Sequence, residues 1–188
     1  GKGQRQGRAC LPCCARSPRL GCAALAPAAP LSGKDPALLE IVNDGAVRTL
    51  ALDRPDARNA LSLSLLKALR AALTEAVEDN VRCLVLTGRG RAFCAGADVM
   101  EWSEEVARGA TDYDWVPQSH ALIQEMAAFP APTIALLNGA AVGGGLDLAL
   151  ACDFRFAADS AKFICSYTKV GYSPDLGGTW LMPRLIGI

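Results

Sequence analysis

The sequence contains a single histidine, His120, and this scarcity removes several kinds of site from consideration. His120 begins a run with an amphipathic helical pattern, and no Ser or Cys stands near it in a nucleophile motif. Zinc sites built from paired histidines need at least two of them at short spacing. We therefore expect a structural or surface role for His120 and no metal site.

The sequence also lacks an excess of charge of either sign and lacks long apolar runs. Lys plus Arg and Asp plus Glu both number 19, which disfavours a nucleic-acid or polyanion binder. Gly, Asp or Pro interrupts the apolar runs well short of about 20 residues, so no membrane span is predicted. No GxGxxG motif comes after the first expected strand and no GxxxxGKS/T motif occurs, which disfavours dinucleotide and P-loop sites.

Eight cysteines are present, and four of them lie in residues 1–33. This segment has basic residues and prolines but no acidic residue, and we expect it to be disordered. Its Cys10 and Cys13 have CxxC spacing, but no second pair occurs at zinc-site spacing. The segment is either a leader that resembles a transit peptide or a non-native extension.

The other four cysteines, Cys83, Cys94, Cys152 and Cys165, stand in apolar contexts and are predicted to be buried. Unpaired cysteines favour a reducing compartment, so we expect a cytoplasmic location, or a mitochondrial one if the leader is a transit peptide.

Residues 34–188 alternate between strand-like and helix-like patterns, which indicates one α/β domain. Expected strands are 39–42 and 47–52, joined by an Asp44–Gly45 hairpin turn, then 81–87, 133–137, 153–157 and 161–167. Expected helices are 60–77, 101–108 (alternatively a mobile loop), 119–129 and 146–151, with another after the polar loop 171–179. The apolar pattern is still running at residue 188, so we expect a helical C-terminal part to be missing.

Residues 133–153 are the stretch around which the chain is organised. They form a short apolar strand, an Asn138–Gly139 turn, three glycines and a helical run that carries Asp147. Glycine lets the backbone approach a ligand closely, and a helix N-terminus offers unpaired N–H groups with partial positive charge. Such a stretch is suited to hold an anion, or an oxygen that becomes one during a reaction. The glycines are also compatible with tight packing of strand on helix alone.

Three loops of the chain resemble those of the enoyl-CoA hydratase/isomerase (crotonase) superfamily. They are 91–98 (RAFCAGAD), 138–147 (NGAAVGGGLD) and 173–179 (SPDLGGT), in the order and at the spacing of that family. The resemblance runs from Leu39 to Ile188 and is closest to isomerase-like members. It implies an α/β fold built as a spiral of ββα repeats, assembly as a homotrimer or dimer of trimers, and an acyl-CoA thioester as substrate without a bound cofactor.

The resemblance also assigns roles to individual residues. The backbone N–H groups of Ala97 and Gly144 would form an oxyanion hole that stabilises a thioester enolate. Coenzyme A would lie beside Ala57 and Arg58 and along the residues Ala95, Gly96, Ala97, Asp98 and Val99. Arg58 would pair with a phosphate of coenzyme A, although a solvated loop position explains this arginine equally well.

The sequence leaves open which residue transfers the proton, because the answer differs between a hydratase and an isomerase. Hydratases of the family place one glutamate after the glycine turn and another 20 positions later, where Asp147 and Tyr167 stand here. A phenol with a pKa near 10 is a poor base at neutral pH, so Tyr167 weakens a hydratase assignment. Asp175 stands where isomerases of the family tend to place a carboxylate, and one base suffices to shift a double bond.

The sequence therefore predicts isomerisation of an enoyl-CoA double bond, with Asp175 as the proton-transfer base and Asp147 assisting. The alternatives are water addition with Asp147 as acid/base, and a non-catalytic subunit that binds CoA thioesters. Both carboxylates also have a structural explanation, because Asp147 lies in the first turn of a helix and Asp175 is a candidate N-cap.

Four further residues carry predictions of their own. We expect Asp153 to cap a helix end or a turn, and Trp102, Trp115 and Met126 to belong to the wall of a pocket or core. Trp102 and Trp115 are also candidates to flank a mobile lid over the acyl chain. Because helices that cover the pocket in the family are missing, we also expect exposed apolar surface.

Overall fold

The larger of two sheets forms the centre of the domain in the computed structural model, which describes residues 38–111 and 113–187. Its strand order is β1–β2–β3–β5–β7, and its first pair is antiparallel while the other pairs are parallel. The strands are β1 (Leu39–Asp44), β2 (Val47–Leu52), β3 (Cys83–Gly88), β5 (Thr133–Leu137) and β7 (Phe154–Ala157). The predictions for residues 1–33 lie outside the described residues.

The second sheet is parallel and its strands are very short. It consists of β4 (Ala92–Cys94), β6 (Ala140–Val142) and β8 (Phe163–Ile164), in that order. Each of these strands comes directly after a strand of the larger sheet along the chain and precedes a helix. The chain thus repeats a ββα unit, which confirms the predicted α/β spiral of such repeats.

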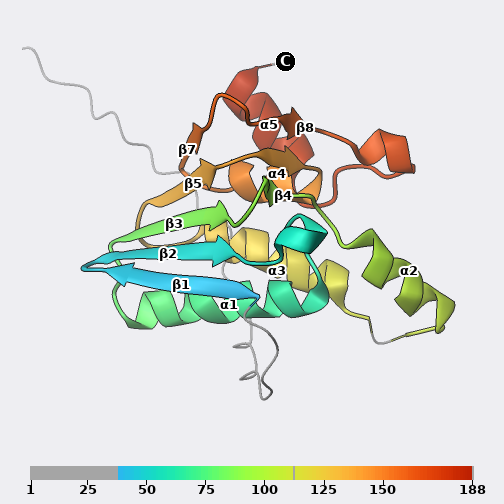
Figure 1. The fold of residues 1–188 in the computed structure, drawn as a ribbon, viewed down its shortest axis with the longest axis horizontal. Helices are drawn as coiled ribbons and strands as arrows, with labels where there is room; N and C mark the ends of the chain where they lie inside the picture. Colours follow the sequence, from blue (N-terminus) through green and yellow to red (C-terminus); the bar gives the residue numbers. More distant parts are fainter. Residues whose placement is uncertain (1–37, 112, 188) are drawn as a thin grey trace, which may run out of the picture.

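Helices cover the larger sheet and complete the repeats. Figure 1 shows α1 (Leu63–Glu78) and α3 (Trp115–Ala127) side by side along β1, β2 and β3, while α2 (Val99–Ala107) projects from the body. The helices α4 (Gly144–Leu150) and α5 (Gly178–Ile186) come after β6 and β8, and two 3-10 turns, η1 (Pro55–Ala57) and η2 (Tyr167–Val170), interrupt the loops. The leucine face predicted for the first helix is buried, with Leu65, Leu66 and Leu69 all fully inaccessible to solvent.

The first helix and the hairpin turn differ from the predictions by a few residues. Helix α1 begins at Leu63 rather than at residue 60, because Leu61 bridges to Ala97 and Ser62 caps the helix. The hairpin turn is Gly45–Ala46, since Asp44 pairs with Val47. Gly45 has a φ of 57°, and a positive φ at the first central residue suits glycine in a two-residue turn.

The later elements differ more. Strands β4 and β6 lie within segments predicted to be loop or turn, because strands of three residues are too short to show an alternating pattern. The predicted strand 161–167 is reduced to β8, since η2 begins at Tyr167. Helix α3 begins at Trp115, four residues before the predicted start at 119, which places Pro117 in the first turn where proline is tolerated.

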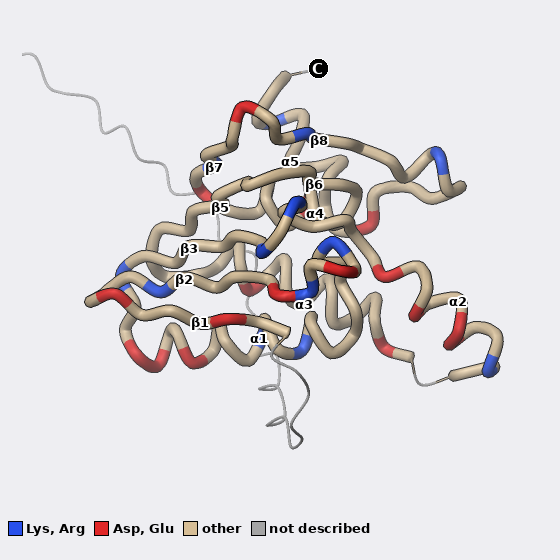
Figure 2. The backbone as a smooth tube through the Cα atoms, in the orientation of Figure 1, with Lys and Arg blue, Asp and Glu red and all other residues tan. Residues whose placement is uncertain are grey.

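The surface carries charges of both signs and some large apolar side chains. Figure 2 shows acidic and basic residues interspersed along the described chain. Phe154 and Phe156 on the edge strand β7 are more than half exposed, as is Trp180 on α5, in line with the predicted exposed apolar surface. None of the helices in residues 38–111 and 113–187 is long and apolar enough to cross a bilayer.

Candidate active site

A pocket of about 550 Å³ lies where the three strands of the small sheet end. Ala95 to Ala97 come after β4, Gly143 and Gly144 after β6, and Ser166 and Tyr167 after β8, and all of these line the pocket. Side chains of α2 and of the loop before α5 complete the wall. Because the carboxyl ends of parallel strands meet at one edge, three distant segments of sequence converge there.

Ala97 and Gly144 come together at the floor of this pocket, as predicted for an oxyanion hole. Gly96 has a φ of 91°, and a Cβ built on it would lie 3.3 Å from the Gly144 nitrogen and 2.7 Å from the Val142 oxygen. Among the backbone hydrogen bonds of the described residues, neither the Ala97 nor the Gly144 N–H donates to a protein acceptor. Two N–H groups without a backbone acceptor therefore lie on adjacent segments that line the same cavity.

Asp175 lies on the pocket wall and is half-buried, in the loop between η2 and α5. It is the only carboxylate among the described residues that line the pocket. The N-cap of α5 is Gly177, so the N-cap explanation offered for Asp175 is wrong. Its side chain is thus left to face the cavity.

Asp147 is placed differently from Asp175. It is 1% exposed and is not part of the pocket wall. Its carboxylate accepts a hydrogen bond from the Tyr167 hydroxyl and lies in contact with Gly178. Burial raises the pKa of Asp147, the Tyr167 hydrogen bond and the backbone of Gly178 lower it, and the charge of Asp175 adds to the increase.

Tyr167 stands between Asp147 and the pocket. Its ring lines the cavity while its hydroxyl points to the buried carboxylate. Burial raises the pKa of Tyr167, and the hydrogen bond and charge of Asp147 raise it further. The phenol therefore stays protonated at neutral pH, which agrees with the prediction that it is a poor base.

The residues predicted to hold coenzyme A fall into two groups. Ala95, Gly96, Ala97 and Val99 line the pocket, whereas Ala57, Arg58 and Asp98 do not. The loop of Ala57 and Arg58 is nevertheless adjacent, because the Ala95 N–H donates to the Arg58 carbonyl at 3.0 Å. Arg58 is exposed, which leaves its guanidinium accessible from solvent.

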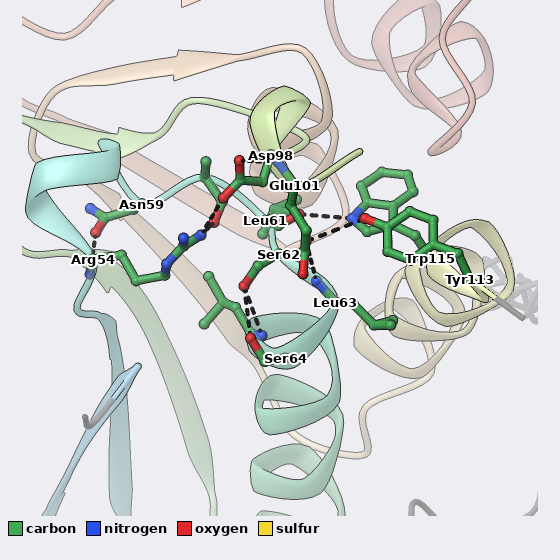
Figure 3. Close-up of polar contacts among 12 residues, drawn as sticks. Arg54, Asn59, Leu61, Ser62, Leu63, Ser64, Asp98, Glu101, Tyr113 and Trp115 are labelled. Carbon is green, nitrogen blue, oxygen red and sulfur yellow. Dashed lines mark hydrogen bonds and ion pairs between the residues drawn. The ribbon is translucent and has the colours of Figure 1, made fainter. Parts of the chain in front are cut away.

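Both oxygens of Asp98 are occupied by protein contacts, as Figure 3 shows. One pairs with the Arg54 guanidinium at 2.9 Å, and the other accepts from the Glu101 N–H at 3.2 Å as the N-cap of α2. Glu101 in turn accepts from the Leu63 N–H at the start of α1 and from the Tyr113 hydroxyl. These contacts fasten the base of α2 to the core.

Aromatic side chains form the outer wall. Trp102 and Trp115 both line the pocket, which confirms the prediction that they belong to its wall. The Trp115 indole donates to the Leu61 carbonyl at 2.7 Å, and its ring centroid lies 6.4 Å from that of Trp102. Tyr172 packs on Trp102 at 4.9 Å and also lines the pocket. It was not among the predicted residues, although its place directly before the loop motif 173–179 was a usable signal.

Asn59 is a second residue that was not predicted. It is fully buried with a φ of 57°, and its amide donates to carbonyl groups at Ala92 and Phe93. It therefore pins the loop beside Arg58 to strand β4. Asparagine tolerates the left-handed conformation well, and this preference was the available sequence signal.

The remaining predictions concern residues away from the pocket. Asp153 accepts from the N–H and hydroxyl of Thr133 and so joins the end of α4 to β5, which confirms a structural role. His120 is exposed and Met126 is buried in the core, both as predicted. In the described part of the chain, no cluster of three or more His, Cys, Asp or Glu residues is arranged to hold a metal ion.

The prediction that the later cysteines are buried holds for two of them. Cys94 and Cys152 are buried, and burial raises the pKa of each thiol to about 12. Cys83 is only half-buried and Cys165 is exposed, because β8 lies at the edge of the small sheet.

Comparison with known proteins places these features in a family. The sequence model described as enoyl-CoA hydratase/isomerase matches residues 43–188. The chain is 40% identical over 144 residues to the 1,2-epoxyphenylacetyl-CoA isomerase of Escherichia coli, which covers 75% of this chain and 55% of the relative. It is 42% identical over 147 residues to the human mitochondrial enoyl-CoA hydratase domain-containing protein 2, covering 77% of this chain and 50% of the relative.

Solved structures agree with this placement. A Pseudomonas aeruginosa protein superimposes with a TM-score of 0.78 at 46% identity, covering 83% of this chain and 67% of its own. An enoyl-CoA hydratase from Bacillus anthracis superimposes with a TM-score of 0.72 at 39% identity, covering 80% and 59%. The chain thus spans about half the length of the curated relatives, 55% and 50% of the two named above.

Proposed function

The chain belongs to the enoyl-CoA hydratase/isomerase family, and on that premise we propose that it shifts a carbon–carbon double bond in an enoyl-CoA thioester. One observation carries the choice of reaction. Asp175 is the single carboxylate among the described residues of the pocket wall, and it shares that wall with Ala97 and Gly144. A double-bond shift needs one base, whereas water addition in this family relies on two carboxylates around one water.

The proposed reaction begins with the carboxylate of Asp175 removing a proton from Cα of a 3-enoyl thioester. The electron pair of the broken C–H bond enters a dienolate, whose oxygen receives hydrogen bonds from the Ala97 and Gly144 N–H groups. Donors already fixed around such an oxygen are worth about 3–4 kcal/mol each in transition-state stabilisation. Asp175 then returns the proton to Cγ, the Cα–Cβ double bond forms, the thioester carbonyl is restored and the base ends as a carboxylate.

Binding of the thioester is part of the same proposal. The pantetheine would pass along Ala95 and Gly96, with the adenosine end beside Ala57 and Arg58. The exposed guanidinium of Arg58 supports phosphate binding, because arginine is well matched to phosphate oxygens. The reaction needs no resident metal or redox group, and a homotrimer or dimer of trimers is the assembly that we propose.

The aromatic wall supports an acyl group with a flat apolar part. Trp102, Trp115 and Tyr172 present ring surfaces to the cavity, and rings of this kind stack favourably on one another. The E. coli relative is named as an isomerase of 1,2-epoxyphenylacetyl-CoA, a thioester whose acyl group carries an epoxidised six-membered ring. Both observations favour an isomerase acting on acyl groups that carry an unsaturated ring.

Water addition to a 2-enoyl-CoA is the second candidate. The name of the Bacillus anthracis neighbour as an enoyl-CoA hydratase and the presence of Asp147 after the glycine turn favour it. In this reaction Asp147 would act as acid/base without a second carboxylate at Tyr167. Its burial behind Tyr167 makes a direct contact with substrate water difficult.

A paired assay tests the proposal. The absorbance of the conjugated 2-enoyl thioester is followed with a 3-enoyl-CoA and separately with a 2-enoyl-CoA, for wild type, Asp175→Asn and Asp159→Asn. Asp159 is an exposed turn residue and serves as a matched control. We expect absorbance to rise from the 3-enoyl substrate, and the rate to fall by about 10²–10⁴-fold in Asp175→Asn alone.

Two other outcomes would overturn the proposal. Absorbance that falls from the 2-enoyl substrate, unaffected by Asp175→Asn, would identify a hydratase. Binding of both thioesters without turnover would identify a non-catalytic CoA-thioester subunit.

A further inference from the structure

The buried carboxylate of Asp147 touches three elements that surround the pocket. Asp147 belongs to the first turn of α4, three residues after the oxyanion donor Gly144. It accepts a hydrogen bond from the hydroxyl of Tyr167 in η2 and lies in contact with Gly178, the first residue of α5. The loop that carries Asp175 runs between these last two contacts.

We propose that Asp147 is a positioning residue rather than a proton-transfer group, and that it fixes the distance between the oxyanion donors and the base Asp175. This inference rests on the proposed function for the identity of the base. The carboxylate clamps both ends of the segment 167–178 to helix α4. The segment would otherwise be held mainly by the contact of Tyr172 with Trp102 and by the buried side chain of Leu176.

The placement of the carboxylate favours a clamp over proton transfer. Asp147 is not on the pocket wall, whereas its hydrogen-bond partner Tyr167 is. Its hydrogen bond is made with a protein donor, and the carboxylate lies beside the N-terminus of α5, where a negative charge is stabilised. A group that transfers protons to substrate needs hydrogen-bond reach of the reacting atoms.

The Asp147 carboxylate leaves no room for a side chain at Gly178. A Cβ built on Gly178 would lie 2.9 Å from Cγ of Asp147 and closer still to one of its oxygens, so a side chain there would force the carboxylate to move. Gly178 does not have a positive φ, so its backbone conformation accepts alanine, and the three atoms nearest to an added Cβ all belong to the Asp147 carboxylate. Gly178→Ala therefore disturbs the clamp while leaving every proposed catalytic atom in the chain.

The test compares three variants of the 188-residue chain. Gly178→Ala disturbs the contact with Asp147, Asp147→Asn changes the carboxylate itself, and Thr179→Ala, at an exposed residue of the same turn of α5, is the control. If Asp147 positions the segment, Gly178→Ala lowers kcat on the order of 10²-fold with little change in KM, because the base is misplaced. Asp147→Asn keeps an acceptor oxygen for the Tyr167 hydroxyl and loses about tenfold or less, the value of one hydrogen bond. Its pH–rate profile keeps the wild-type shape, and Thr179→Ala behaves as wild type.

Hydrogen exchange supplies a readout that is independent of turnover. We expect the amides of residues 171–177 to exchange faster in Gly178→Ala than in wild type and in Thr179→Ala. Faster exchange in a protein that isomerises neither substrate would count against the proposed function while supporting the clamp.

Either of two results would overturn the clamp. One is a loss of turnover of about 10²–10⁴-fold in Asp147→Asn with a changed pH–rate profile and unchanged exchange, which identifies Asp147 as a proton-transfer group. The other is wild-type kcat together with wild-type exchange in Gly178→Ala.

Discussion

The two sheets of the domain differ in strand length, in burial and in the loops that their strands lead into. Strands of the larger sheet have 4 to 6 residues, and those of the smaller one have 2 or 3. The larger sheet supplies fully or almost fully buried leucines to the core, among them Leu50, Leu52, Leu84 and Leu86. The smaller sheet also reaches the core, through the fully buried Phe93, but its strands lead into the loops of the pocket, with Ala97, Gly144 and Tyr167 just beyond them.

This difference separates stability from chemistry within one domain. The long strands bury a row of leucines under α1 and α3, while the short strands end at the pocket and set where its loops begin. A change in the larger sheet should therefore alter the free energy of unfolding and leave the rate of folded molecules unchanged. A change at the ends of the smaller sheet should lower the rate of folded molecules and leave the free energy of unfolding nearly unchanged.

The largest effect is expected from Leu84→Ala in β3. Leu84 is fully buried, so the variant should lose about 2–5 kcal/mol of unfolding free energy through lost burial and a residual cavity. Urea unfolding measures this loss, and Val85→Ala on the less buried face is the control, with a smaller loss expected. The kcat per folded molecule should match wild type, and a lower kcat in Leu84→Ala would break the separation of the two sheets.

Gly96→Ala tests the smaller sheet. The new Cβ would meet the Val142 oxygen at 2.7 Å and displace the backbone beside Ala97 and Gly144, the proposed oxyanion donors. Loss of one such donor costs about 3–4 kcal/mol in the transition state, so kcat should fall on the order of 10²–10³-fold. Steady-state turnover of the 3-enoyl substrate measures it.

The matched control for Gly96→Ala is Gly109→Ala. Gly109 also has a positive φ, of 66°, but a Cβ there meets nothing within 4 Å. It thus reproduces the backbone strain without the contact. Equal kcat losses in both variants would assign the effect to strain and remove the oxyanion argument.

Ser62→Ala tests the stability of α1, a helix that covers the larger sheet. The Ser62 hydroxyl accepts from the Leu65 N–H at 3.2 Å and caps α1 (Figure 3). Its removal should lower the unfolding free energy by about 1 kcal/mol, whereas Ser62→Gly should lower it by only a few tenths. Thermal unfolding of the two variants measures both values, and equal losses would argue against a cap.

The pH dependence of stability provides the smallest and most local test. The pKa of Asp147 is raised above its ordinary value of 3.8 by burial, so the folded state holds this proton more tightly than the unfolded state does. Its contribution is present in full below pH 3.8 and is lost as pH rises through the raised pKa. The stability of wild type relative to Asp147→Asn should therefore decrease as pH rises above 3.8, and an increase would contradict the burial of this carboxylate.

The sequence alone specified most of the larger sheet and the identity of the loops. Regular patterns of apolar residues predict four of the elements, because each element buries a regular set of side chains. The patterns are the alternation in residues 47–52 for β2, the apolar runs for β3 and β5, and the spacing of the leucines for α1. The three loop motifs indicated the family and singled out Ala97, Gly144 and Asp175. These signals are local, so they are readable without the fold.

Only the tertiary structure decided how the candidate groups are used. Strands β4, β6 and β8 are too short to carry a pattern of their own, and their positions depend on pairing between segments far apart in the chain. Asp147 and Asp175 have the same chemical character in the sequence, yet packing places one behind Tyr167 and the other on the pocket wall. The sequence determines that both residues are aspartates. Whether a carboxylate can reach the cavity depends on the side chains that pack around it, and these come from distant parts of the chain.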